Sequence, residues 1–281
     1  MGGAHHKVVI INNIKLCNSR SARDAFGCDS LHLFAGEERR LSNMLYLASV
    51  WVIPIIVAVT FHEAAHGFVA RLLGDDTAWR LGRVSFNPLK HIDPVGTILL
   101  PGFLLLLHSP FLFGYAKPVP INFRALRNPR RDMIWVAAAG PAMNIALAIF
   151  AALAFHLIDY LPGSAAPWVA ENLKNALIIN VVLAVFNLFP LPPLDGGRIA
   201  VGVLPDAAAL PLARLEPYGL LILISLLFIL PMLGAQIGVD VNIVWRFIAR
   251  STDAIIDAIL RLTGAGLANL VLAGRGTFVW R

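Results

Sequence analysis

The sequence predicts an all-α integral membrane protein, a multi-span helical bundle with a small membrane-associated β or re-entrant region. Hydrophobic residues make up 58% of the 281 residues and charged residues only 14%, and the mean hydropathy is +0.72. Soluble domains contain about 25% charged residues, so we expect the chain to lie in a lipid bilayer. The net charge of +6 comes from basic residues between apolar runs. This pattern is a topology signal and does not indicate a nucleic-acid partner.

Three regions are expected along the chain: a polar N-terminal extension (1–43), a membrane-embedded core (44–239) and an amphipathic helix with a tail (240–281). The extension shows no signal-peptide core and no sustained helical period. Its six Lys and Arg residues predict a cytosolic start, which conflicts with the topology of the later spans. We therefore hypothesise that the extension is not native and that translation begins at Met44. N-terminal sequencing of the native protein tests this.

The first span is expected over 44–73, because 44–61 carries no charge and leads directly into the sequence FHEAAHG. Gly74 is a plausible helix stop. The following loop, 75–93, contains Lys and Arg residues and is therefore placed in the cytosol. Residues 94–116 are uncharged but interrupted by prolines and flanked by basic loops on both sides, which favours a re-entrant loop or hairpin.

Residues 117–121, with two prolines, are expected to be extended and to form a short β segment near the site. The clearest transmembrane helix is 133–158, interrupted by Gly140 and Pro141, and 175–194 then returns toward the cytosol. Another uncharged run, 218–239, predicts a fourth crossing. Charged residues recur every three or four positions after 241, so the last helix is expected at the membrane interface.

Two histidines in the first span suggest a metal site. His62 and His66 are four residues apart, so their imidazoles project from one helix face and can reach a single Zn²⁺. Glu63 stands beside the first and can hold a water molecule. A lone histidine in an apolar helix is usually a core residue, but the combined spacing and neighbouring carboxylate favour a hydrolytic zinc site.

A catalytic zinc usually has three protein ligands, so a third ligand is needed from elsewhere. Asp195 is the best candidate because it ends an apolar span and precedes two glycines; the alternative is a helix-terminal turn residue. Asn144 lies in an apolar span and has two equally weighted interpretations. It either joins helices by hydrogen bonds or donates to the carbonyl oxygen of a scissile peptide.

The motif around His62 and His66, followed by GPAMN (140–144) and NLFPLPPLDG (187–196), resembles the site-2 protease family of intramembrane zinc metalloproteases. The resemblance covers about 44–232. It implies that His62, His66 and Asp195 bind one Zn²⁺ per chain, with Glu63 as catalytic base and Asn144 as a substrate or oxyanion contact. Unlike larger relatives, the chain shows no stretch that predicts a PDZ or CBS domain.

The resemblance implies hydrolysis of peptide bonds within or near transmembrane segments of membrane proteins. We also expect a bacterial cytoplasmic (inner) membrane, and the basic loop after the first span places the active site toward the cytosol. A substrate helix must unwind before cleavage because its peptide groups are hydrogen-bonded, and residues 117–121 are hypothesised to pair with the unwound strand. The alternatives are a zinc-binding membrane transporter and a non-proteolytic scaffold. Neither needs Glu63, so this residue separates them from an enzyme.

Overall fold

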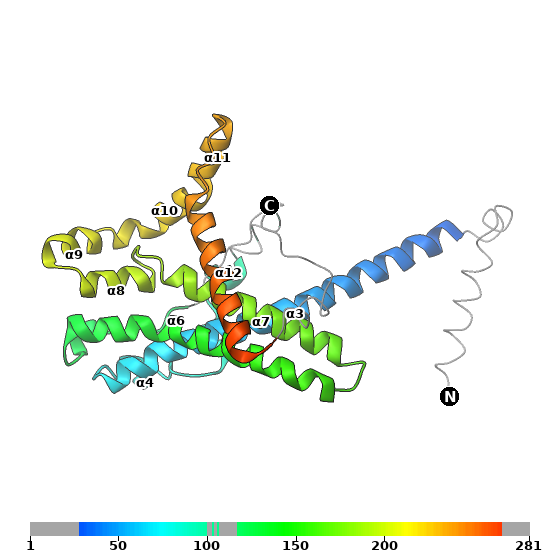
Figure 1. Cartoon of the computed structure of the whole chain (residues 1–281), viewed down its shortest axis with the longest axis horizontal. Coiled ribbons are helices and arrows are strands. Elements are labelled where there is room, and N and C mark those ends of the chain that lie inside the picture. The colour runs from blue at the N-terminus through cyan, green and yellow to red at the C-terminus, as the bar shows by residue number, and fades with distance from the viewer. Residues whose placement is uncertain (1–27, 100–102, 104–105, 107–116, 266–281) are drawn as a thin grey trace. The chain divides into compact units, whose positions relative to one another are not determined.

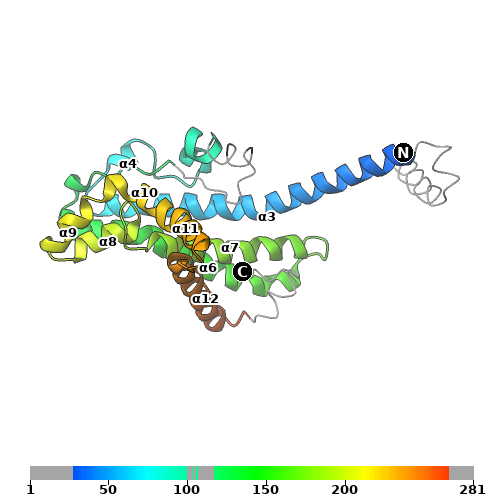
Figure 2. The same ribbon diagram turned by 90° about the horizontal axis from the view of Figure 1, so that it is seen from above.

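The computed structural model describes residues 28–99, 103, 106 and 117–265. Every regular element in these ranges is a helix, and none of these residues forms a strand. The chain divides into two compact units, Met1–Ser49 and Val50–Arg281. All predicted site residues belong to the second unit, whose helices are shown in two perpendicular views (Figures 1 and 2).

Helix α3 (Cys28–Leu72) contains the first candidate membrane span, Ser42–Leu72. The span agrees with the predicted run, and the helix that contains it begins earlier, at Cys28. Leu, Glu and Arg are frequent in this stretch, and their high intrinsic helix propensity accounts for the earlier start. After α3 the chain turns at Gly74, whose φ of +117° favours glycine.

Two further candidate spans form an antiparallel pair in the second unit. Helix α6 (Pro129–Ala154) continues into the 3₁₀ helix η4 (Phe155–Tyr160), and α7 (Ala166–Asn187) returns after a short turn. The two helices lie side by side in both views (green in Figures 1 and 2). The predicted interruption at Gly140 and Pro141 is wrong, since α6 passes through both. Transmembrane helices tolerate proline where neighbouring groups satisfy the freed backbone.

The segment after α7 packs closely on the start of the next helix. Helix α8 (Asp195–Val203) begins with Asp195 itself. A Cβ on Gly196 would lie within 3.0 Å of Leu188 backbone atoms, and one on Gly197 would meet the backbone around Pro192. The two glycines therefore allow α8 to approach the preceding turn. Both glycines lie inside the helix.

A fourth candidate span, Asp206–Gln236, is assembled from short helices. These are α9 (Asp206–Ala213), η5 (Glu216–Tyr218), α10 (Gly219–Ile224), η6 (Ser225–Ile229) and α11 (Leu230–Gln236). Four spans confirm the prediction of a multi-span helical membrane protein.

The last described helix, α12 (Ile243–Thr263), packs against α6 and α7. Its buried residues Ile248, Ile259 and Leu260 join the main hydrophobic core. Amphipathic helices commonly bury their apolar face against protein in this way. The predicted amphipathic period is therefore present in α12, and the apolar face of this helix contacts the bundle.

The predicted β or re-entrant region is not found in the described residues. Loop 75–93 contains α4 (Thr77–Arg80) and the 3₁₀ helix η1 (Pro88–His91), and a π-helical segment, η2 (Pro94–Leu99), follows. Most of the predicted re-entrant stretch, 100–116, lies outside the described residues. Residues 117–122 form neither helix nor strand, which agrees with prolines that cannot donate to a ladder.

Candidate metal centre and catalytic base

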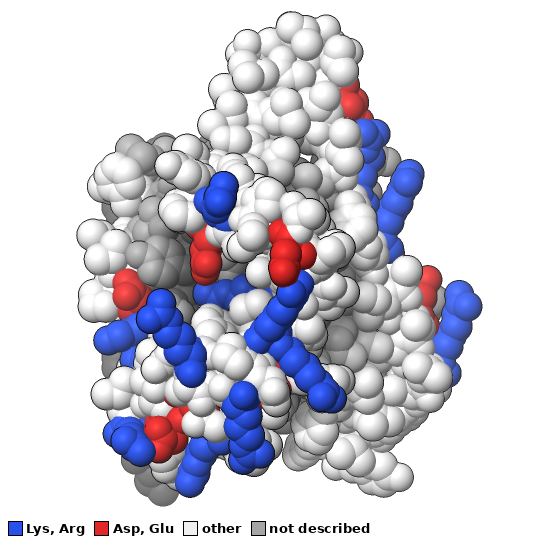
Figure 3. Space-filling model, turned by 90° about the vertical axis from the view of Figure 1, so that its left-hand side faces the viewer, with Lys and Arg blue, Asp and Glu red and all other residues white. Residues whose placement is uncertain are grey.

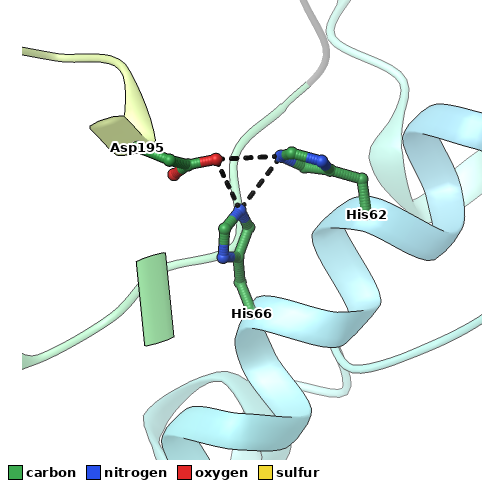
Figure 4. A group of neighbouring side chains, drawn as sticks. All are labelled: His62, His66 and Asp195. Carbon is green, nitrogen blue, oxygen red and sulfur yellow. Dashed lines mark hydrogen bonds and ion pairs between the residues drawn. The ribbon is translucent and has the colours of Figure 1, made fainter. Parts of the chain in front are cut away.

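The structure brings the three predicted metal ligands together (Figure 4). His62 and His66 come from successive turns of α3, and Asp195 comes from the first turn of α8. The two Nε2 atoms are 3.0 Å apart, and each lies 3.3 Å from Oδ2 of Asp195. All three residues are buried, with at most 8% of their surface exposed.

The outer nitrogen of each imidazole has an acceptor as its partner. Nδ1–H of His66 donates to the backbone carbonyl of Val136 at 2.7 Å, and Nδ1–H of His62 donates to Oδ1 of Asn144 at 2.6 Å. Both acceptors belong to α6. In its neutral form each ring with the hydrogen on Nδ1 therefore directs its Nε2 lone pair inward, which is the orientation that a metal ligand needs.

These inward-facing atoms fit a zinc ion. Two Nε2 lone pairs and a carboxylate oxygen that face one another repel unless a proton or a cation lies between them. Ligand atoms about 2.0–2.1 Å from a tetrahedral zinc are about 3.3 Å from one another, close to the observed separations. Oδ2 of Asp195 is buried without a conventional hydrogen bond. Two imidazoles and one carboxylate are also a donor set of catalytic zinc sites.

Asp195 supplies negative charge to this centre. Burial raises the pKa of its carboxyl group, but hydrogen bonding and charge from His62 and His66 outweigh burial and lower the pKa to about 2. The group is therefore ionised at neutral pH. A divalent cation at the meeting point of the three side chains would supply the positive charge that the two imidazoles supply in its absence, and would leave both imidazoles neutral.

Gly140 of α6 makes room for the two histidines. A Cβ at this position would lie within 3.0 Å of His62 and His66 ring atoms, including Nε2 of His66. The side-chain hydrogen of glycine thus lets α6 approach the ligand pair closely. The sequence pattern at this glycine indicates only a helix interruption. The signal that could have revealed its role was its position one helical turn before Asn144.

Glu63 is held separately from the metal ligands. Its Oε2 accepts a hydrogen bond from the backbone N–H of Val119 at 2.8 Å. The same stretch is fixed further along by Asp75, a buried carboxylate whose Oδ2 accepts from the N–H of Asn122 at 2.6 Å. Residues 117–122 therefore lie along α3 and position the carboxylate of Glu63.

Asn144 is fully buried, and both ends of its amide contact protein. Its oxygen accepts from His62, and Nδ2 donates to Oδ1 of Asn180 at 2.8 Å and more weakly to the carbonyl of Ala58 at 3.3 Å. Of the two interpretations of this residue, the geometry favours hydrogen bonding between helices. Its oxygen also contacts Nδ1 of His62, a candidate metal ligand, a contact that its sequence position did not reveal.

The fold and the donor set define an integral membrane protein with a buried metal centre. Comparisons with known proteins place it more specifically. Residues 155–230, which include Asp195, match Peptidase family M50. The protein named "Putative zinc metalloprotease YwhC" of Bacillus subtilis (strain 168) is 37% identical over 223 residues, or 77% of this chain and 91% of that protein.

More distant relatives carry similar names. "Putative zinc metalloprotease Rip2" of Mycobacterium tuberculosis (strain ATCC 25618 / H37Rv) is 30% identical over 193 residues, covering 68% of this chain and 71% of that protein. "Putative zinc metalloprotease MJ0611" of Methanocaldococcus jannaschii is 33% identical over 154 residues, covering 53% and 70%. No solved structure matches the chain. The chain belongs to the M50 family of site-2-type membrane zinc metalloproteases.

Proposed function

We propose that this protein is an intramembrane zinc protease that hydrolyses peptide bonds within or near transmembrane segments of membrane proteins. The observation that carries the proposal is that Asp195 of α8 meets His62 and His66, which lie with Glu63 in a helix long and apolar enough to span a membrane. Buried ionisable groups are expensive at this depth. A peptidase site gives each of them a role.

We assign the metal to His62, His66 and Asp195 and the proton transfers to Glu63. When bound, zinc supplies a Lewis acid that polarises the scissile carbonyl and acidifies the attacking water. Glu63 accepts the proton from that water and delivers it to the leaving amine. The N–H of Val119 holds Oε2 of Glu63, so we assign the proton transfers to Oε1.

Asn144 acts in this proposal by positioning His62. Loss of a partner that orients a metal-binding histidine lowers metal affinity about 10- to 100-fold. An oxyanion contact would leave zinc binding intact and lower the catalytic rate instead. Zinc affinity of Asn144→Leu distinguishes the two roles, and unchanged affinity contradicts positioning.

Residues 117–121 are the proposed contact for an unwound substrate strand. Most of their backbone N–H groups are missing or already hydrogen-bonded, which limits how many can pair with that strand. Pro118 and Pro120 have no N–H, Lys117 N–H donates to the carbonyl of His91, and Val119 N–H donates to Glu63. Ile121 is the remaining donor for strand pairing. We expect Ile121→Pro to reduce cleavage of helical substrates more than of flexible peptides; equal losses contradict strand pairing.

We propose that the active site opens toward the cytosol of a bacterial inner membrane. Lys and Arg residues gather on the face shown in Figure 3, whereas the turn between α6 and α7, 161–165, contains neither. Positive loops stay in the cytoplasm. An alkaline phosphatase reporter inserted after Gly163 should be active, because this turn then lies outside. Activity of a reporter inserted after Arg83 instead would reverse the orientation.

The function is tested with purified protein in detergent and a panel of tagged single-span membrane proteins. The comparison is between wild type and Glu63→Ala, with zinc quantified in both. The proposal predicts cleavage within the span by wild type, and bound zinc without cleavage in the variant. If both proteins bind zinc and neither cuts even flexible substrates, a zinc transporter or a non-proteolytic scaffold replaces the protease.

A further inference from the structure

Three asparagines are buried in the apolar helices α6 and α7. Asn144, Asn175 and Asn180 each expose 2% or less of their surface. A buried amide costs free energy unless its donors and acceptors have partners, and all three make hydrogen bonds. Asn175 joins α7 to α3 by donating to the carbonyl of Val50 at 2.8 Å. Asn180 instead contacts Asn144, and so connects to the metal centre.

The orientation of the Asn180 amide follows from a backbone group. Its nitrogen lies 2.8 Å from the carbonyl of Ala176, one turn earlier on α7. A carbonyl oxygen can only accept, so Nδ2 of Asn180 must face it. Oδ1 of Asn180 is then directed at Asn144, 2.8 Å away.

The orientation of the Asn180 amide determines which nitrogen of His62 carries the hydrogen. Because Asn180 presents an oxygen, Asn144 must present Nδ2 to it. Oδ1 of Asn144 is consequently the atom that faces Nδ1 of His62. That nitrogen must carry the hydrogen, which leaves the Nε2 lone pair for the metal. A flipped Asn144 amide would present a donor to Nδ1 and favour the opposite tautomer.

We propose that Asn180 is a positioning residue of the metal centre, which sets the tautomer of His62 through Asn144. The proposal rests on the zinc site of the proposed function. It extends the centre to α7, a helix that contributes none of the three ligands. Asn144 also contacts the carbonyl of Ala58, but at 3.3 Å this bond is longer and therefore weaker. The shorter bond to Asn180 dominates the orientation.

Three variants test the proposal in the full-length protein in detergent. Asn180→Leu removes the acceptor for Asn144. Asn180→Asp keeps an acceptor oxygen toward Asn144 but replaces the donor to the carbonyl of Ala176, so it should bind zinc more tightly than Asn180→Leu even if the protein is less stable. Asn175→Leu is the matched control, because it removes an equally buried amide from the same helix without touching Asn144. Zinc dissociation constants are measured by competition with a chromogenic chelator, and the visible absorption of the Co²⁺-loaded protein reports ligand geometry.

We expect Asn180→Leu to weaken zinc binding about 3- to 10-fold and to alter the Co²⁺ spectrum. This is less than the about 10- to 100-fold cost of losing a direct partner of the ligand. Asn175→Leu should lower thermal stability and leave both metal readouts unchanged. The double variant Asn144→Leu/Asn180→Leu should bind zinc no more weakly than Asn144→Leu alone, because Asn180 acts through Asn144.

Equal metal readouts for Asn180→Leu and Asn175→Leu would overturn the proposal, as would additive losses in the double variant. If Asn180→Leu does not fold, Asn180→Ser replaces it, since its shorter side chain cannot reach Asn144. These readouts need no proteolysis. A wild type that binds zinc but cleaves nothing refutes the proposed function alone, whereas a wild type that binds no zinc refutes both.

Discussion

The proposed metal ligands and the proposed catalytic base are held in different ways, although Glu63 follows His62 directly in the sequence. His62, His66 and Asp195 are buried, and the two histidines are fixed by groups of α6. Glu63 is only partly buried, and its carboxylate is fixed by the N–H of Val119, in a segment that is neither helix nor strand.

The difference matches two tasks. A metal centre needs ligands fixed before the ion binds, and packed helices with buried hydrogen bonds provide this. A base that works on a substrate must remain reachable, and a connecting segment beside it can adjust as substrate enters. Changes to residues that hold His62, His66 or Asp195 should therefore alter zinc affinity. Changes to Glu63 or to the residue that holds it should alter the cleavage rate alone.

The sharpest separation is expected from Glu63→Gln. The amide keeps the size of the side chain but cannot accept the proton. Cleavage should fall about 10²- to 10⁴-fold, while zinc content stays at the wild-type level. Kinetics on a cleaved substrate and metal analysis of the same preparation check this. Loss of zinc in Glu63→Gln would mean that zinc binding depends on Glu63 and is not independent of the catalytic base.

Gly140→Ala is the corresponding change on the ligand side. The added methyl group would meet ring atoms of His62 and His66, so zinc affinity should fall about tenfold or more, and cleavage with it. Gly163→Ala is the control, because a Cβ there meets nothing within 4 Å. Chelator competition measures both. Equal zinc affinity in the two variants would show that α6 does not constrain the ligands.

Val119→Pro removes the N–H that holds Glu63 and is compared with Val119→Ala, which keeps it. We expect the proline variant to cleave about tenfold more slowly, below the hundredfold that a displacement of about 1 Å can cost. Zinc content should match wild type in both. If the alanine variant slows cleavage as much as proline, side-chain packing matters and the hydrogen bond does not.

The smallest effect is expected at Arg130, which ties the start of α6 to the end of α8. Its guanidinium donates to the carbonyls of Gly202 and Leu204 and to Asp206. The side chain is half exposed, so Arg130→Ala should lower stability by only about 0.5–1 kcal/mol. Denaturant unfolding measures this, with Arg131→Ala as reference. A drop in zinc affinity would show that α8 needs the hydrogen bonds of Arg130 to position Asp195.

Local patterns predicted the grouping of His62, His66 and Asp195 that the structure shows. The four-residue spacing of His62 and His66 depends only on helix geometry, and Asp195 was the best-placed acid at the end of an apolar span. The four spans followed from length and hydropathy. These features need no knowledge of which helices pack together.

The remaining features depend on packing between distant segments. Gly140 resembled a helix break until α6 was seen against the histidines. Asn144 had two equal interpretations until its partners on α3 and α7 were known. The start of α3 was missed because helix propensity in a charged stretch leaves no apolar period. Hydrogen bonds between remote residues leave no periodic trace in one sequence.

The most direct test of the account is cleavage-site mapping on a single-span substrate as zinc is removed and restored. Wild-type protein is treated with a chelator, dialysed and reloaded with zinc, and products are identified by mass spectrometry at each stage. We predict cleavage within or beside the span that disappears with the metal and returns at one zinc per chain. Cleavage that persists without zinc, or that reloaded Glu63→Gln performs equally well, would contradict a zinc protease built on His62, His66, Asp195 and Glu63.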